Sequence, residues 1–254
     1  MQTYFHRHIF KSFSAKSTSV IILIVFAVAC SPRFSQGIRK NDLKKDIQII
    51  TDSGSMVVRL SDSTPLHRDN FIRLVKSRFY DGISFHRVIK GFMVQAGDPR
   101  TKKTKGRIDT IGRGRLRYIA EARKDKIPAE FRSQLFHKKG VLAAAREGDS
   151  ANPARGSSYS QFYLVQGRVF TDFSLDSTEQ HRLKGRKIPV AHREVYKTLG
   201  GAPHLDQNYT IFGEVIRGVE VIDRIAGVKT AGKEGADKPV ADVRIQKMRL
   251  VPRK

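Results

Sequence analysis

Two polar residues interrupt the apolar stretch FHRVIKGFMVQAGD, which covers residues 85–98. Arg87 and Gln95 stand where a plain core strand would carry aliphatic side chains. A guanidinium is a fixed cation with several N–H donors, and an amide can both donate and accept hydrogen bonds. These residue types suit binding and electrostatic stabilisation without proton transfer. Arg87 taken alone could equally form a structural ion pair.

The other polar residues do not form the patterns of other reaction classes. His86 and His204 have no acidic residue at a spacing typical of a catalytic triad or a metal site. A further set of histidines is too dispersed for a zinc site: His67, His137, His181 and His192. Ser160 lacks the context of an activated nucleophile, and no glycine cluster matches a phosphate loop. We therefore expect no metal, no cofactor and no covalent intermediate.

Alternating apolar residues predict the strands that position this polar pair. The sequence IQIITDSGSMVVRL predicts a β-hairpin that turns at Asp52-Ser53-Gly54. A strand pair is expected within residues 85–98, and four later strands are expected at residues 140–145, 160–165, 209–215 and 243–251. The count favours a mainly β, antiparallel domain that is closed, because closure removes exposed edges.

Two helices are expected beside this sheet. Thr64-Pro65 supplies an N-cap and a proline at the first helical position, which predicts a helix from about Pro65 to Ser77. The second helix is expected near residues 219–226.

Two segments are too long for ordinary connections and are interpreted as insertions. Residues 100–126 are rich in Lys, Arg and Gly and predict an exposed loop, with a short helix at residues 119–124. Residues 168–200 contain a helix start at Thr171 or Asp172, a break at Gly185 and a second helix start at Ile188-Pro189. Long loops are often functional, so both insertions could bind partners or could simply pack.

The N-terminus resembles an export signal. Three basic residues and no acidic one lie within residues 6–16, just before the apolar run VIILIVFAVA at residues 20–29. A run of this length is too short to span a bilayer, which takes about 20 apolar residues, but it fits the apolar core of a signal peptide. It ends at Cys30, the chain's single cysteine, and the small residues before Cys30 resemble a bacterial lipobox.

These features predict the domain organisation. Residues 1–29 would be a lipoprotein signal peptide, residues 30–45 a polar tether from lipidated Cys30, and residues 46–254 one domain. The expected location is the bacterial cell envelope, with a membrane anchor at Cys30 and the domain facing the periplasm. An uncleaved anchor and a plain secretory signal are the alternatives.

Composition limits the partners. The 254 residues include 39% apolar residues and carry a formal charge of +24, and the single cysteine excludes a disulfide framework. The charge favours attraction to polyanions. Lysine and arginine are scattered and rarely alternate with aromatic residues, unlike a dedicated nucleic-acid surface, so we expect no specific nucleic acid.

Four sequence blocks, taken in order, resemble the cyclophilin family of peptidyl-prolyl isomerases. They are FHRVIKGFMVQAGD at residues 85–98, GVLAAAR at 140–146, SQFYLV at 160–165 and HLDQNYTIFGEVIRGVEVID at 204–223. The resemblance runs from about Asp46 to Val251 outside the two insertions. It implies a closed eight-stranded antiparallel β-barrel capped by two α-helices, a substrate groove on its outer surface, and a monomer.

The resemblance also implies roles for single residues. Arg87 would direct its guanidinium to the prolyl carbonyl and favour a pyramidal prolyl nitrogen, while Gln95 would hold the substrate backbone. Ala145 would line the groove for the residues that precede proline. The residues expected at the pocket for the prolyl ring are Phe92, Met93, Tyr163, His204, Leu205 and Tyr209.

The chain departs from the family pattern at three of these positions. Tyr163 stands where many relatives carry phenylalanine, and Tyr209 where many eukaryotic relatives carry histidine. His204 stands where cyclosporin-sensitive relatives carry tryptophan, and this chain has no tryptophan. The indole donor that supports tight cyclosporin binding is therefore absent.

The resemblance implies peptidyl-prolyl cis-trans isomerase activity on X-Pro bonds of exported proteins, with proline-containing polypeptides as partners. Two other classes stay open. One is a non-catalytic proline-binding or chaperone module that presents its insertions to an envelope partner. The other is a basic adaptor for anionic polymers, whose affinity would fall steeply with salt.

Overall fold

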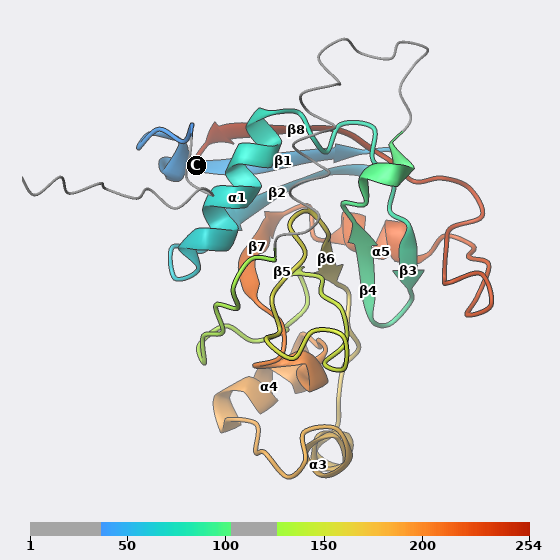
Figure 1. The fold of residues 1–254 in the computed structure, drawn as a ribbon. Coiled ribbons are helices and arrows are strands. Elements are labelled where there is room, and N and C mark those ends of the chain that lie inside the picture. The colour runs from blue at the N-terminus through green and yellow to red at the C-terminus, as the bar shows by residue number, and fades with distance from the viewer. Residues whose placement is uncertain (1–36, 103–125) are drawn as a thin grey trace, which may run out of the picture. The chain divides into compact units, whose positions relative to one another are not determined.

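Eight strands form one antiparallel sheet in the computed structural model, which describes residues 37–102 and 126–254. The strands are β1 (Lys45–Thr51), β2 (Gly54–Leu60), β3 (Arg87–Ile89), β4 (Met93–Ala96), β5 (Val141–Ala144), β6 (Phe162–Val165), β7 (Ile211–Arg217) and β8 (Ile245–Pro252). Their order across the sheet is β3-β4-β6-β5-β7-β2-β1-β8 (Figure 1). Each overlaps a range that the sequence predicted, although β1 begins two residues earlier than expected, β7 ends two residues later and β8 ends one residue later.

Two helices each pack one apolar face against the inner face of the sheet. Helix α1 (Pro65–Lys76) packs against β7 and β8, and α5 (Glu220–Ala226) packs against β2, β3 and β4 (Figure 1). Phe71 and Leu74 of α1 and Ile222 and Ile225 of α5 belong to the same apolar cluster as the inward residues of the strands. Three short 3-10 helices also occur in the described part of the chain: η2 (Asp42–Lys44), η3 (Pro99–Thr101) and η4 (Pro203–Leu205).

The expected closed barrel is wrong, because the sheet is an open half-barrel whose edge strands are β3 and β8. Residues before β3 reach only the start of β8 in the described part of the chain: Ile245 N donates to Ile83 O over 2.8 Å, and Phe85 N donates to Val243 O over 2.8 Å, on either side of an isolated bridge between Ser84 and Arg244. Strand β3 is short, and Val88 N donates to Asp237 O in the loop before β8 instead of to β8 itself. The loop backbone therefore occupies the position at which β8 would have to hydrogen-bond to β3 in a closed barrel.

Helix α1 begins at Pro65 with Thr64 at the N-cap position, as predicted. The side chain of Thr64, however, makes no cap hydrogen bond. Instead, the carboxylate of Glu130 accepts hydrogen bonds from Leu66 N at 3.2 Å and His67 N at 3.0 Å. A negative charge at this end also suits the helix dipole.

The insertion at residues 168–200 forms two more helices, α3 (Asp172–His181) and α4 (Val190–Thr198), as its two helix starts predicted. Thr171 caps α3 through a reciprocal pair of hydrogen bonds with Ser174. The described part of the chain therefore has four helices, whereas the expected capped barrel has two. The insertion has an apolar cluster of its own, made of Phe170, Leu175, Leu183, Ile188 and Tyr196, with Phe136 packed against it.

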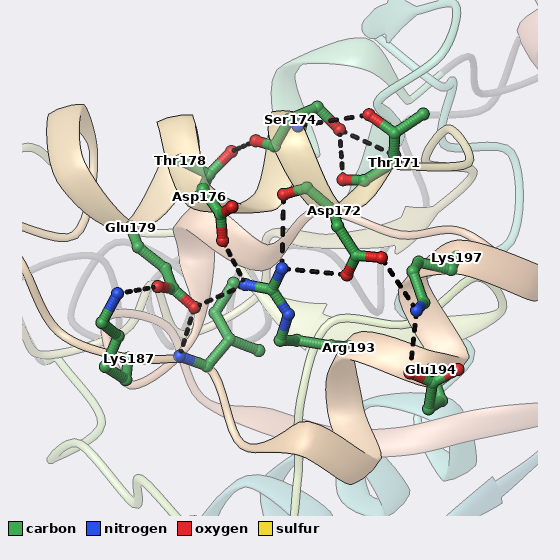
Figure 2. A network of polar contacts seen from close by, with 11 residues as sticks. Thr171, Asp172, Ser174, Asp176, Thr178, Glu179, Lys187, Arg193, Glu194 and Lys197 are labelled. Carbon is green, nitrogen blue, oxygen red and sulfur yellow. Dashed lines mark hydrogen bonds and ion pairs between the residues drawn. The ribbon is translucent and has the colours of Figure 1, made fainter.

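Polar contacts join α3 to α4 (Figure 2). The guanidinium of Arg193 lies 3.0 Å from Asp172, 2.9 Å from Asp176 and 2.9 Å from Glu179. The side chain of Glu179 is only 3% exposed, and Lys187 Nζ lies 2.8 Å from its carboxylate. Arg193 thus holds three acidic residues of α3 from one position on α4.

Several expectations lie outside the described residues: the signal peptide, Cys30 and the short helix at residues 119–124. Within residues 37–102 and 126–254, no helix has the length and apolar character needed to cross a membrane.

Candidate active site

Strand register places the two polar residues of the opening stretch on one face of the sheet. Arg87 of β3 is paired with Gln95 of β4, and Gln95 is paired with Tyr163 of β6. Tyr163 is in turn paired with Ala143 of β5. Directly paired residues project to the same side of a sheet, so these four residues form a row across four strands.

This row lies on the outer face, opposite the core. Along β4 and β6, Val94 and Leu164 belong to the core cluster, whereas Met93 and Tyr163 belong to a second apolar cluster. The alternation follows from the period of two residues in a strand. The second cluster consists of Met93, Val141, Ala143, Ala145, Tyr163, Val165, Ala202, Leu205 and Ile211, with Ile89, Phe92, Leu135 and Tyr209 packed against it.

Loops bring the remaining pocket residues onto this face. Leu205 lies in η4 and is 8% exposed. The ring centroid of His204 lies 5.2 Å from that of Phe92, and the ring of Tyr209 meets Tyr163 edge-on at 6.0 Å. The six residues expected at the pocket therefore lie together on the outer face.

Arg87 stands beside the pocket with its guanidinium accessible. Its side chain is 43% exposed, and its Nε lies 3.7 Å from the carboxylate of Asp237. Because that contact is long, a ligand carbonyl could compete with it for the guanidinium.

Gln95 is oriented by Gln161, which directly precedes β6. Its Nε2 donates to Oε1 of Gln161 over 3.0 Å, and Ala145 N donates to Gln161 O. Gly97 allows this approach: its φ is +97°, and a Cβ there would lie 2.2 Å from Ser160 O. A cavity of about 380 Å³ opens here, and Gln95, Ala145 and Gln161 are among its lining residues. This cavity is where residues before a bound proline could lie.

His204 is uncharged at neutral pH. Burial lowers its pKa to about 4, and the nearby guanidinium of Arg182 in the insertion adds to the effect. The pocket wall at His204 therefore offers an aromatic surface beside Phe92, not a cation.

The sequence interpretation missed a buried polar chain behind the pocket. His137 Nδ1 lies 2.9 Å from Asp206 Oδ1, and His137 Nε2 lies 2.9 Å from the hydroxyl of Tyr163. On its other side, Asp206 Oδ2 accepts a hydrogen bond from Tyr196 OH over 2.7 Å. One signal could have revealed the chain: a buried tyrosine in place of phenylalanine needs a partner for its hydroxyl.

Across residues 37–102 and 126–254, no three His, Cys, Asp or Glu side chains are grouped closely enough to hold an ion. The site offers hydrogen-bond donors, a fixed cation and an apolar cluster on the outer face of the sheet.

Comparison with known proteins gives one family. The family model described as "Cyclophilin type peptidyl-prolyl cis-trans isomerase/CLD" matches residues 46–250. A Staphylococcus epidermidis protein named "Putative peptidyl-prolyl cis-trans isomerase" is 33% identical over 216 residues, which cover 85% of this chain and 95% of that protein. A Staphylococcus aureus (strain USA300) protein of the same name is 31% identical over 216 residues, with the same coverage of both chains.

Solved structures share the fold. A cyclophilin type peptidyl-prolyl cis-trans isomerase of Cryptosporidium parvum matches with a TM-score of 0.54 and 22% identity, covering 83% of this chain and 99% of that one. A second crystal structure of that protein, in the presence of the dipeptide Ala-Pro, matches with a TM-score of 0.53, covering 82% and 99%.

Proposed function

The chain belongs to the cyclophilin family of peptidyl-prolyl cis-trans isomerases, and we propose that it isomerises X-Pro bonds of exported proteins from a lipid anchor in the bacterial cell envelope. The isomerase activity follows from the family match and the named relatives. The observation that carries the assignment to this site is the row in which strand register sets Arg87, Gln95 and Tyr163 side by side. The substrates and the location are the proposed part.

The reaction needs rotation about a bond that resonance holds planar. For X-Pro the cis and trans forms differ by only about 0.5–1 kcal/mol, yet they interchange over tens to hundreds of seconds. In the twisted state the prolyl nitrogen loses conjugation and becomes pyramidal. A donor directed at the nitrogen lone pair or the nearby carbonyl stabilises that state more than either planar form.

Arg87 supplies this donor without proton transfer, because a guanidinium stays charged and keeps its N–H groups. Shortening a process of roughly 100 s to about 10 ms requires a factor of ~10⁴, or about 5.5 kcal/mol. A hydrogen bond to a charged group contributes about 1.5–3 kcal/mol. Arg87 therefore accounts for part of the barrier reduction, and positioning by the pocket and Gln95 must supply the rest.

The apolar cluster holds the prolyl ring while the preceding residue turns. Phe92, Met93, Tyr163 and Leu205 offer aromatic and aliphatic surface, and burial of that surface contributes about 25 cal/mol per Å². The cavity beside Gln95 and Ala145 accepts the chain on the N-terminal side of proline. Rotation about the X-Pro bond requires this arrangement, in which the prolyl ring is held and the preceding chain is free to move.

Activity is tested with the full chain in detergent and a short Ala-Pro peptide, by exchange NMR between the cis and trans signals. The proposal predicts accelerated exchange in which Gln95→Ala raises KM. Peptide binding without any acceleration would contradict the proposal and would support the non-catalytic proline-binding module instead.

The envelope location rests on residues 1–30 and is tested separately. If Cys30 is lipidated, the mature protein begins at Cys30, carries acyl chains by mass spectrometry and sediments with membranes. Cys30→Ser should remove the acyl mass and release the protein from the membrane fraction. An unmodified Cys30 in a protein that stays with the membrane would favour the uncleaved anchor.

A further inference from the structure

We propose that His137, oriented by Asp206, positions Tyr163 in the prolyl pocket, and that the insertion at residues 168–200 acts on this pocket through Tyr196. The inference rests on the proposed isomerase function, because it concerns the same pocket. It assigns a positioning role to three buried residues and gives the insertion a link to substrate binding.

The contacts form an unbroken buried chain. His137 is 0% exposed, Tyr163 4%, Asp206 5% and Tyr196 0%. Asp206 Oδ1 accepts hydrogen bonds from His137 N at 2.8 Å and from the ring at 2.9 Å, while Oδ2 accepts one from Tyr196 OH at 2.7 Å. The other ring nitrogen of His137 meets Tyr163 OH at 2.9 Å.

The tautomer of His137 sets the direction of each hydrogen bond. A carboxylate accepts, so Nδ1 of His137 carries the proton that is donated to Asp206. In that tautomer Nε2 has no proton, so it is an acceptor for the hydroxyl proton of Tyr163. Burial raises the pKa of Tyr163 well above its ordinary range, with Tyr209 and Asp206 adding to the effect, so this hydroxyl keeps its proton.

The role is positioning, not nucleophilic attack. Although carboxylate, imidazole and hydroxyl follow one another as in a catalytic triad, Tyr163 is buried and its raised pKa opposes formation of a phenolate. A phenylalanine ring at this place would be held by packing alone. The hydroxyl bond to His137 instead fixes the tilt of the ring that faces Met93 and Leu205 in the outer cluster.

The insertion contacts this series of hydrogen-bonded residues at Asp206, at the end away from Tyr163. Tyr196 lies in α4 and also belongs to the insertion's own apolar cluster, and Arg186 Nη2 donates to Asp206 O over 2.5 Å. Asp206 directly follows η4, which carries His204 and Leu205. Two residues of the insertion therefore hold the loop that contributes two pocket residues.

The test measures the dissociation constant of an Ala-Pro peptide by NMR titration of the full chain, together with kcat and KM from exchange. The prolyl ring stays in the pocket throughout rotation, so a loosened pocket should raise the dissociation constant and KM while kcat changes little. Loss of one hydrogen bond should raise the dissociation constant about fivefold. We expect the dissociation constant to rise about fivefold in Tyr163→Phe and in His137→Asn, and about two- to fivefold in Tyr196→Phe.

Two comparisons separate positioning from general destabilisation. In the Tyr163→Phe background, His137→Asn should add less than twofold, because the bond through which it acts is already gone. His137→Gln, whose side-chain oxygen can reach the Nε2 position, should bind better than His137→Asn. The matched control is His67→Asn, since His67 is equally buried and its Nδ1 lies 2.7 Å from Glu130 in another part of the domain.

The inference is overturned if His137→Asn weakens binding equally in both backgrounds, or if His67→Asn weakens it as much. An unchanged dissociation constant in Tyr163→Phe would also overturn it. Peptide binding can be titrated without catalysis, so an inactive wild type would refute the proposed isomerase function and still leave this inference measurable.

Discussion

Replacing Arg193 by alanine removes three of the ion pairs that join α3 to α4, and the effect can be worked out contact by contact (Figure 2). The ion pairs with Asp172 and Asp176 involve carboxylates that are 62% and 64% exposed, so each contributes a few tenths of a kcal/mol. Glu179 is different, because its side chain is 3% exposed. Loss of a charged hydrogen bond to a buried carboxylate costs about 2–3 kcal/mol, even though Lys187 remains as a partner.

The expected total is about 3 kcal/mol, and the insertion should bear most of it because its apolar cluster is separate from the core of the sheet. Hydrogen exchange of the amides in α3 and α4 measures this local free energy of opening. Protection there should fall by about 150-fold, while amides of β1 and β2 should change little.

Lys197→Ala is the matched control one turn along the same helix. Its partners Asp172 and Glu194 are 62% and 61% exposed, so protection should fall by less than about threefold. Equal exchange in Arg193→Ala and Lys197→Ala would refute the reasoning that burial of Glu179 makes the difference. An equal loss of protection in β1 would refute the separate stability of the insertion.

Two further changes test stability and its pH dependence. Glu130→Gln should lower the free energy of unfolding by about 2 kcal/mol, because the carboxylate caps α1 and pairs with His67. Burial opposes ionisation of Glu130, but the hydrogen bonds from His67 and Leu66 leave its pKa below the ordinary 4.5. The stability that Glu130 contributes is therefore present above pH 4.5 and is lost as pH falls through the lowered pKa. Urea unfolding should show a smaller difference in stability between pH 3 and pH 7 for the variant than for the wild type. Burial lowers the pKa of His204 from 6.5 to about 4, so the unfolded chain takes up this proton more readily than the folded protein. The free energy of unfolding should therefore fall as pH drops from 6.5 towards 4. His204→Phe should remove up to about 2.5 kcal/mol of that fall at pH 4.5. Identical pH slopes in the wild type and His204→Phe would show that this histidine does not titrate as its surroundings require.

The strands and helices could be predicted because their signals are local. Apolar patterns and turn residues predicted all eight strands to within about two residues, and Pro65 and Thr171 marked the starts of two helices. The outer-face pocket could be expected only from the order of four sequence blocks. No single block distinguishes an outward Met93 from a core residue.

The features that could not be predicted depend on residues far apart in the chain. Thr64 looked like the cap of α1, yet Glu130 performs that function from 64 residues beyond Leu66. His137 and Asp206 are 69 residues apart, so no spacing rule could pair them. Barrel closure failed for a similar reason, because a distant loop supplies the backbone oxygen that bonds to β3.

The most direct measurement of the central claim is exchange NMR on an Ala-Pro peptide with the wild type, Arg87→Ala, Arg87→Lys and Arg217→Ala. Arg217 lies exposed at the end of β7, so its replacement removes a like charge away from the pocket. We predict that Arg87→Ala lowers kcat at least tenfold, that Arg87→Lys restores little because lysine lacks the planar fork, and that Arg217→Ala matches the wild type. Unchanged exchange in a folded Arg87→Ala protein would contradict the role of this guanidinium in stabilising the twisted peptide bond.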